Sequence, residues 1–247
     1  MRKTTAIITA LVVLISLAAC GSGSSTPKNE PASAPTVDAT VSPAPVSAQA
    51  ETDAASESAK ATTGANILVA YFSRVGNMNV EDGVDLVTSA SVNLNGESIN
   101  GNAELLAHMA QDITGGDLFF IETADKYPAQ YRATTDQASV EQSQNARPAL
   151  ASHMENMDSY NTIIRISPIW WGDLPQALCT FLEEYDFSGK TILPLCTHEG
   201  SGMGRSTSDI AALCPGATLL EGLAVRGGNA SSAKADVEAW IIASGIL

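Results

Sequence analysis

The sequence predicts an α/β domain with a doubly wound, five-stranded parallel sheet, and two observations lead to this prediction. Short apolar runs alternate along the chain with longer segments whose apolar residues recur at helical spacing. Strands that are separated by helices join through crossover connections, which make neighbouring strands parallel. All 13 aromatic residues lie at Tyr71 or later, so the core belongs to that part of the chain.

The expected elements follow one another in a regular order. The strands comprise residues 67–72, 117–122, 162–167, 191–196 and 217–225. The helices comprise residues 102–114, 128–144, 174–185, 206–213 and 231–244. Between the first strand and the first helix, residues 78–100 contain an Asn95-Gly96 turn signal and predict an inserted hairpin. Two residues fit poorly in their expected strands. Arg165 would place a charge in a central strand, and Pro194 has no N–H to donate to the neighbouring strand, so a proline usually lies at a sheet edge or at a bulge.

The chain begins like an exported protein. After Met1, Arg2 and Lys3 comes an apolar run, residues 6–17, which is short for a membrane span of roughly 20 residues. The run ends in Leu-Ala-Ala-Cys at Cys20, which resembles the lipobox of bacterial lipoproteins. In that family the cysteine is lipidated and anchors the protein stably. An ordinary signal peptide with a chance cysteine, or an uncleaved anchor, are the alternatives.

Three parts of the chain are therefore expected: a lipoprotein signal peptide (1–19), a lipidated cysteine with a disordered tether (20–65) and a folded domain (66–247). Residues 21–65 contain no Leu, Ile, Met or aromatic residue and cannot bury enough surface to fold. We expect an extracytoplasmic protein that is anchored to a bacterial membrane by Cys20 alone.

The charge balance excludes one class of partner. The chain has 13 Lys+Arg against 27 Asp+Glu, a net charge of −14. Nucleic-acid binding through phosphate contacts needs a basic face, so we expect no nucleic-acid partner. In such an acidic protein a phosphate group would be held by backbone N–H groups.

Three polar loops follow the first, third and fourth strands, and the carboxyl ends of such strands form the ligand-binding edge of a parallel sheet. The first loop contains Ser73, Arg74, Val75 and Asn77, and its phosphate-binding part is split by the insertion, resuming at Asn102-Ala103. A polar strand-to-helix turn without any ligand explains these residues equally well.

The other two loops are more distinctive. Residues 168–175 (PIWWGDLP) place Trp170 beside Trp171, and an exposed Trp at a strand end can stack on a planar ligand. The alternative is one core and one boundary tryptophan. Residues 197–204 (THEGSGMG) are rich in glycine but do not match a dinucleotide fingerprint. No Gly-x-Ser-x-Gly elbow is present, so a serine hydrolase is not supported.

The histidines and cysteines do not suggest a metal site. His108, His153 and His198 lack metal-ligand spacing, and we expect no metal. Beyond Cys20, the chain has Cys179, Cys196 and Cys214. Cys179 and Cys196 fall in expected core elements, and a disulfide is left open because no spacing favours one.

Together the loops resemble the flavodoxin-like family, most closely its branch with a Tyr-Phe-Ser-Arg start and a Pro-x-Trp-Trp-Gly loop. The matching strings are ILVAYFSR (67–74), GNAELLAHM (101–109), GGDLFFIE (115–122), PIWWGDLP (168–175), FLEEYDFSGKTILPLCTHEGSG (181–202) and GLAVRG (222–227). The resemblance covers about residues 66–245 and implies the strand order 2-1-3-4-5.

The resemblance also implies an FMN site. The residues that it assigns to FMN are Ser73, Arg74, Val75, Asn77, Asn102, Ala103, Pro168, Ile169, Trp170, Trp171, Gly172, Thr197, His198, Glu199, Gly200, Ser201 and Gly202. The phosphate would lie at the first loop, the ring would face one tryptophan, for which we favour Trp171, and the third loop would line the pyrimidine edge. Ala103 stands where the family usually has Thr, and a lost hydroxyl would remove about 1 kcal/mol.

The function that follows is an FMN-binding redox protein, acting either as an electron carrier or as an FMN-dependent quinone- or azo-type reductase. In both cases the flavin carries the chemistry, so no side chain is expected to be catalytic, and the redox partner is not identified. The alternative is a flavin-free lipoprotein that uses the tryptophan loop to bind an aromatic or sugar ligand.

Overall fold

The computed structural model describes residues 66–79, 89–95 and 98–247. Its main sheet is parallel and has the order β4-β1-β5-β6-β7, with β8 also paired to β6. The strands are β1 (Ile67–Tyr71), β4 (Asp117–Phe120), β5 (Thr162–Pro168), β6 (Thr191–His198), β7 (Thr218–Leu219) and β8 (Leu223–Arg226). The doubly wound sheet and its 2-1-3-4-5 order are thereby confirmed.

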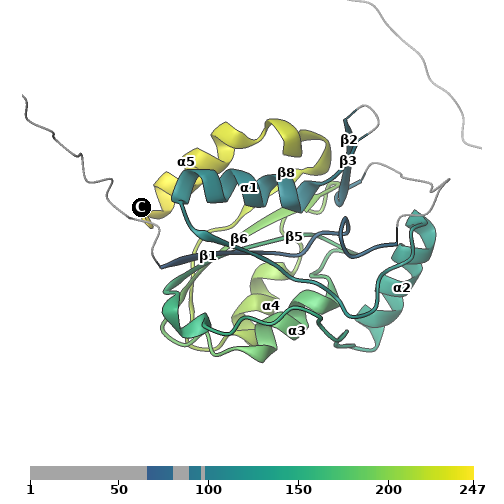
Figure 1. Ribbon diagram of the computed structural model, residues 1–247, viewed down its shortest axis with the longest axis horizontal. Coiled ribbons are helices and arrows are strands. Elements are labelled where there is room, and N and C mark those ends of the chain that lie inside the picture. Colours follow the sequence, from purple (N-terminus) through teal and green to yellow (C-terminus); the bar gives the residue numbers. More distant parts are fainter. Residues whose placement is uncertain (1–65, 80–88, 96–97) are drawn as a thin grey trace, which may run out of the picture. The chain divides into compact units, whose positions relative to one another are not determined.

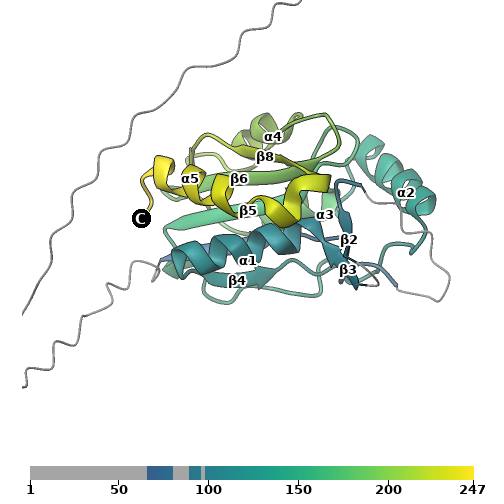
Figure 2. The same ribbon diagram turned by 90° about the horizontal axis from the view of Figure 1, so that it is seen from above.

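Helices cover both faces of the sheet (Figure 1). On one face lie α1 (Asn102–Thr114) and α5 (Lys234–Ser244), and on the other α3 (Gln176–Glu184) and α4 (Ser206–Leu213). The helix α2 (Tyr131–Ser143) lies at one end of the sheet, near the hairpin of β2 (Val92–Asn95) and β3 (Ser98–Gly101), as both Figure 1 and Figure 2 show. Two short 3-10 helices complete the fold, η1 (Met157–Ser159) and η2 (Gly227–Ser232).

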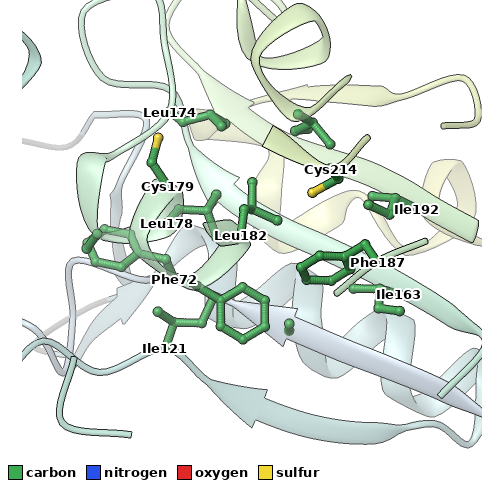
Figure 3. Packing of buried hydrophobic residues seen from close by; sticks show 14 of the residues in the cluster. Phe72, Ile121, Ile163, Leu174, Leu178, Cys179, Leu182, Phe187, Ile192 and Cys214 are labelled. Atoms are coloured by element: carbon green, nitrogen blue, oxygen red, sulfur yellow. The ribbon is translucent and has the colours of Figure 1, made fainter. Parts of the chain in front are cut away.

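Each face has its own apolar core. Beneath α3 and α4, Phe72, Leu178 and Phe181 pack in a cluster that Figure 3 shows from close by. Beneath α1 and α5, Leu106 and Val237 belong to a second cluster, with strand side chains that point to this face of the sheet, such as Ile164. Because both faces are covered, β1 is buried along its whole length, which explains its continuous apolar run.

The last strand differs from the prediction. We expected one strand over residues 217–225, but the structure has two short strands, β7 and β8, with a break between them. Ile192 pairs with Leu219, and Leu195 pairs with Leu223. Between these two pairs the chain advances by three residues in β6 but by four from β7 to β8, as in a bulge with one extra residue. The break faces Pro194, which has no N–H for the ladder. The proline thus lies opposite a bulge, but the extra residue belongs to the neighbouring strand, between β7 and β8, and not to β6.

The remaining boundaries differ by a few residues at most, and the inserted hairpin is present as the antiparallel pair β2–β3. The expected final helix is divided into η2 and α5. The signal peptide, Cys20 and the tether lie outside the described residues. Among residues 66–79, 89–95 and 98–247, none of the helices is long and apolar enough to cross a bilayer.

Arg165 is fully buried in the central strand β5. Its Nη1 donates to the Ser167 Oγ at 2.6 Å, while its Nε and Nη2 have no hydrogen-bond partner within the described part of the chain. Burial lowers the pKa of the guanidinium to about 10, so it stays protonated at neutral pH. A buried cation with one hydrogen bond is costly, because it has lost its hydration without gaining a counter-charge.

We expect Arg165→Met to raise the free energy of unfolding by about 1–2 kcal/mol, because an apolar side chain of similar length removes the desolvation cost. Arg165→Ala should instead lower it by about 2 kcal/mol, because it leaves a cavity. Urea unfolding of the two variants beside the unmodified protein measures both effects. If Arg165→Met is as destabilised as Arg165→Ala, burial of the Arg165 guanidinium does not lower the stability of the fold.

Candidate functional site

A pocket of about 420 Å³ lies where β1 and β5 end and the loop after β6 begins. Its walls are the loop after β1, the segment before β2, α2, the tryptophan loop after β5 and the glycine-rich loop after β6. The lining residues are Arg74, Ser89, Ala90, Ser91, Tyr131, Thr134, Thr135, Ala138, Ile169, Trp170, Trp171, Gly172, Glu199 and Ser201. The three loops singled out by the sequence therefore meet at one pocket.

The tryptophan loop is a tight two-residue turn. The Trp170 N–H donates to the Asp173 carbonyl at 2.9 Å, and the Asp173 N–H donates to the Trp170 carbonyl at 3.0 Å. The two residues between them, Trp171 and Gly172, have φ angles of 53° and 78°. A turn with two positive φ angles favours Asn and Gly, so a tryptophan in the first position is strained.

This turn separates the two indole rings. Trp170 is half-buried, packs edge-on against Phe72 and Tyr127, and donates from its Nε1 to the Ser91 Oγ at 2.8 Å. Trp171 is 62% exposed and donates from its Nε1 to the Thr135 carbonyl on α2 at 2.8 Å. Both rings line the pocket, and Trp171 presents the larger open surface.

Three predicted residues carry buried polar atoms without a partner in the described part of the chain. They are the Ser73 Oγ, the Asn102 Oδ1 and the Thr197 Oγ1. Ser73 follows β1, Thr197 lies near the end of β6, and Asn102 begins α1. A Cβ added to Gly101 would lie 2.0 Å from the Ser73 Oγ, so this hydroxyl directly adjoins the start of α1. No side chain caps that helix, whose first turn offers N–H groups and a positive dipole end to an anion.

Part of the helix start is engaged by the chain itself. The Asn102 N–H donates to the Ser91 carbonyl at 3.0 Å, and its side-chain Nδ2 donates to the carbonyls of Ser89 and Ala90. Residues 89–91 therefore cover the first residue of α1 and at the same time form one wall of the pocket.

Arg74 is a buried cation at the pocket wall. It is 1% exposed, its Nη2 donates to the Ala129 carbonyl at 2.7 Å, and its guanidinium lies 6.0 Å from the centre of the Tyr131 ring. Arg74 and Glu199 are the charged residues among those that line the pocket.

Several predicted residues lie beside the pocket without lining it. The Asn77 amide is buried and joins Ser73 to Ile121 and Thr123 by hydrogen bonds, so it holds the first loop in place. The His198 Nδ1 accepts from the Gly200 N–H at 2.8 Å and shapes the third loop. The other predicted residues outside the lining are Ser73, Val75, Asn102, Ala103, Pro168, Thr197, Gly200 and Gly202.

The wall formed by α2 was not predicted. Tyr131, Thr134, Thr135 and Ala138 lie on one side of this helix, but three of them are common polar or small residues with no distinctive pattern. Their spacing along the sequence was the one pattern that could have indicated this wall, because residues 131, 134, 135 and 138 lie on one face of a helix.

A carboxylate pair lies behind the tryptophan turn. Burial of the Asp209 carboxyl and its hydrogen bond with Asp173 raise the pKa of Asp209 to about 6. Burial alone would raise the pKa of Asp173, but hydrogen bonds with Asp209, Arg205 and the Leu174 N–H together lower it. Asp209 is therefore the member of the pair that keeps its proton at mildly acidic pH.

The described residues contain no group of three or more His, Cys, Asp or Glu side chains placed to hold a metal ion. Cys179, Cys196 and Cys214 are buried free thiols, and burial raises the pKa of each. The exposed indole of Trp171 suits the pocket to a flat aromatic ligand, and the Ser73 hydroxyl beside the start of α1 is suited to an anion.

The chain is similar to one protein family and to several solved structures. Residues 92–243 match the model of the family described as Flavodoxin. A crystal structure of a provisionally assigned flavoprotein from Bacteroides eggerthii DSM 20697 is 26% identical, with a TM-score of 0.56, covering 73% of this chain and 98% of its own. A second such protein, from Bacteroides uniformis ATCC 8492, is 27% identical, with a TM-score of 0.55 and coverages of 72% and 99%. No curated protein matches the chain significantly.

The carboxylate pair predicts a pH-dependent stability. Because the folded state raises the pKa of Asp209, the stability that its proton provides is complete at low pH and is lost as the pH rises through about 6. We expect Asp209→Asn to be more stable than the unmodified protein at pH 8, by about 1 kcal/mol after solvent screening, and no more stable at pH 5. Thermal unfolding at the two pH values measures this, and an equal gain at both would contradict it.

Proposed function

This chain belongs to the flavodoxin family, and from that premise we propose that it is an FMN-binding redox protein. The observation that carries the proposal is the meeting of three loops at one pocket that Trp171 lines, together with the unpartnered buried hydroxyl of Ser73 beside the start of α1. The family match and the two similar flavoprotein structures support the same assignment.

The residues present fit the group in chemical terms. The Ser73 hydroxyl, which adjoins the start of α1, can donate a hydrogen bond to a phosphate oxygen, which would supply the partner that it lacks. N–H groups of the first turn of α1 can donate to the same phosphate, although Ala103 brings no hydroxyl. The pocket volume of about 420 Å³ lies within the range of small-molecule sites.

When bound, FMN supplies the electron-transfer chemistry. The residues of this chain hold the group and shape its surroundings. The Trp171 ring offers an aromatic face, while Trp170 packs against Phe72 and Tyr127 and forms an apolar part of the pocket wall. The carboxylate of Glu199 and the acidic domain oppose the arrival of further negative charge, which lowers the reduction potential of the site.

Electron carrier and reductase differ in what else reaches the pocket. The exposed Trp171 and Glu199 leave the pocket accessible from solvent, as either role requires. Turnover of a reduced nicotinamide nucleotide with a quinone or an azo compound would identify a reductase, whereas a carrier would show little. We propose that the protein works outside the cytoplasm, is attached to the membrane only through lipidated Cys20, and exchanges electrons with a redox partner.

One observation favours the flavin-free alternative. The backbone and side-chain N–H groups of Asn102 already donate to three carbonyls of residues 89–91. Fewer donors at the start of α1 are then left for a phosphate, which suits a ligand without one. That alternative is a lipoprotein that binds an aromatic or sugar ligand between the tryptophan loop and α2.

Titration with FMN separates the two proposals. Protein comprising residues 21–247 should quench the fluorescence of added FMN and retain a yellow colour after gel filtration, because the ring enters an aromatic pocket. Unquenched FMN and a colourless protein would contradict the proposal. Thermal stabilisation by a non-flavin ligand, with none by FMN, would support the alternative.

The phosphate site makes a separate prediction. Ser73→Ala should weaken FMN binding about fivefold, because one hydrogen bond of about 1 kcal/mol is lost. Riboflavin, which has the ring but no phosphate, should bind the variant and the unmodified protein equally. Fluorescence titration with both flavins tests this, and an equal loss for riboflavin would show that Ser73 does not contact the phosphate.

A further inference from the structure

We propose that Asp173 is the positioning residue of this pocket. Its carboxylate holds the strained Trp170–Asp173 turn against the loop before α4 and against α2, and thereby fixes the ring of Trp171 at the pocket. The inference rests on the proposed function, since a fixed aromatic ring matters for binding a flat cofactor such as FMN.

The turn needs support from its surroundings. Trp171 has a φ angle of 53°, in the left-handed region that costs roughly 1–2 kcal/mol for most residues other than glycine. Such a conformation persists only where neighbouring contacts determine it. The two backbone hydrogen bonds between Trp170 and Asp173 close the turn. Because both bonds lie within the turn, other contacts must fix the turn relative to the rest of the domain.

The Asp173 carboxylate provides those contacts. It is nearly buried, and its Oδ1 accepts from the Leu174 N–H at 2.7 Å. Its Oδ2 accepts from the Arg205 Nη2 and, at 3.1 Å, from the Gln142 Nε2. One carboxylate therefore joins the start of the α3 segment, the loop before α4 and the helix α2.

The loop before α4 is also fastened through the backbone. The Arg205 N–H donates to the Gly172 carbonyl at 2.9 Å. A Cβ on Gly204 would lie 2.2 Å from that carbonyl oxygen, so only glycine permits this approach. The ion pair of Arg205 with Asp173 lies directly beside this backbone contact and holds the two loops that line the pocket together.

The contacts of α2 lie two helical turns apart. Gln142 donates to Asp173, and the Thr135 carbonyl accepts from the Trp171 Nε1 at 2.8 Å. Residues separated by seven positions share one face of a helix, so α2 lies along the turn and meets both its carboxylate and its indole. A displacement of the carboxylate would therefore move Trp171 relative to its partner on α2.

The test uses the full chain, purified in detergent, with and without FMN. Asp173→Asn keeps the size of the side chain and an acceptor for the Leu174 N–H but removes the charge that binds Arg205. We expect hydrogen exchange in peptides covering residues 169–174 to quicken about tenfold without FMN, while peptides from β5 keep their rate. With FMN, we expect about tenfold faster dissociation and a changed visible absorption spectrum.

Asp186→Asn is the matched control. The Asp186 Oδ1 also accepts a backbone N–H, from Ser188 at 2.8 Å, but its carboxylate lies on the surface and does not line the pocket. This variant should leave both exchange and FMN dissociation unchanged. A background of Trp171→Ala adds a second control, because Asp173→Asn should then weaken FMN binding by less than about twofold if it acts through Trp171.

The outcomes are distinguishable. If the unmodified protein binds no FMN, the proposed function fails, while exchange at residues 169–174 still decides the role of Asp173. Unchanged exchange in Asp173→Asn would overturn the inference, and so would an undiminished effect in the Trp171→Ala background. If Asp173→Asn does not fold, Arg205→Met, which leaves the carboxylate with its other partners, should show the same changes to a smaller degree, and no change would overturn the inference.

Discussion

The two backbone hydrogen bonds between Trp170 and Asp173 are the interaction on which the pocket depends. They close a turn of two residues between β5 and α3, and this sharp reversal sends neighbouring indoles in different directions. Trp170 joins the aromatic core with Phe72 and Tyr127, while Trp171 reaches the surface of α2. A longer or more relaxed loop would not place consecutive tryptophans against two separate walls. The strain at Trp171 is the cost of that arrangement, and the carboxylate of Asp173 offsets it.

The sheet provides the rigid base for this turn. Because β5 lies between β1 and β6, its carboxyl end is held on both sides by parallel ladders. Pro194 interrupts the outer ladder of β6, and the strand on its far side divides into β7 and β8. The break leaves Leu195 to His198 paired with β8, so the end of β6 still leads directly into the loop after it. The irregularity therefore stays away from the edge at which the ligand loops meet.

Local patterns predicted much of this arrangement, and tertiary contacts explain what they missed. The helices α1 and α4 have the predicted bounds because apolar spacing and flanking glycine or proline define them locally. The divided last strand depends on a proline in a different strand, which no local pattern reports. The three loops were predicted to converge because parallel strands end at one edge, whereas the α2 wall depends on how that helix packs against the turn. Asp173 was noted only as part of the tryptophan string, since its partners Gln142 and Arg205 are distant in sequence.

The charges at the pocket differ from the net charge of the domain. The acidic composition led us to expect an anion to be held by backbone N–H groups, while the resemblance also assigned Arg74 to FMN, and Arg74 lies buried at the pocket wall. Acidic groups on the surface are screened by salt over about 10 Å, whereas a buried guanidinium acts through a medium of low dielectric constant. The charge at the pocket wall is therefore not described by a count of 27 acidic against 13 basic residues. The anionic ligand that we propose would meet the positive dipole end of α1 at short range, while the acidic surface opposes it at longer range.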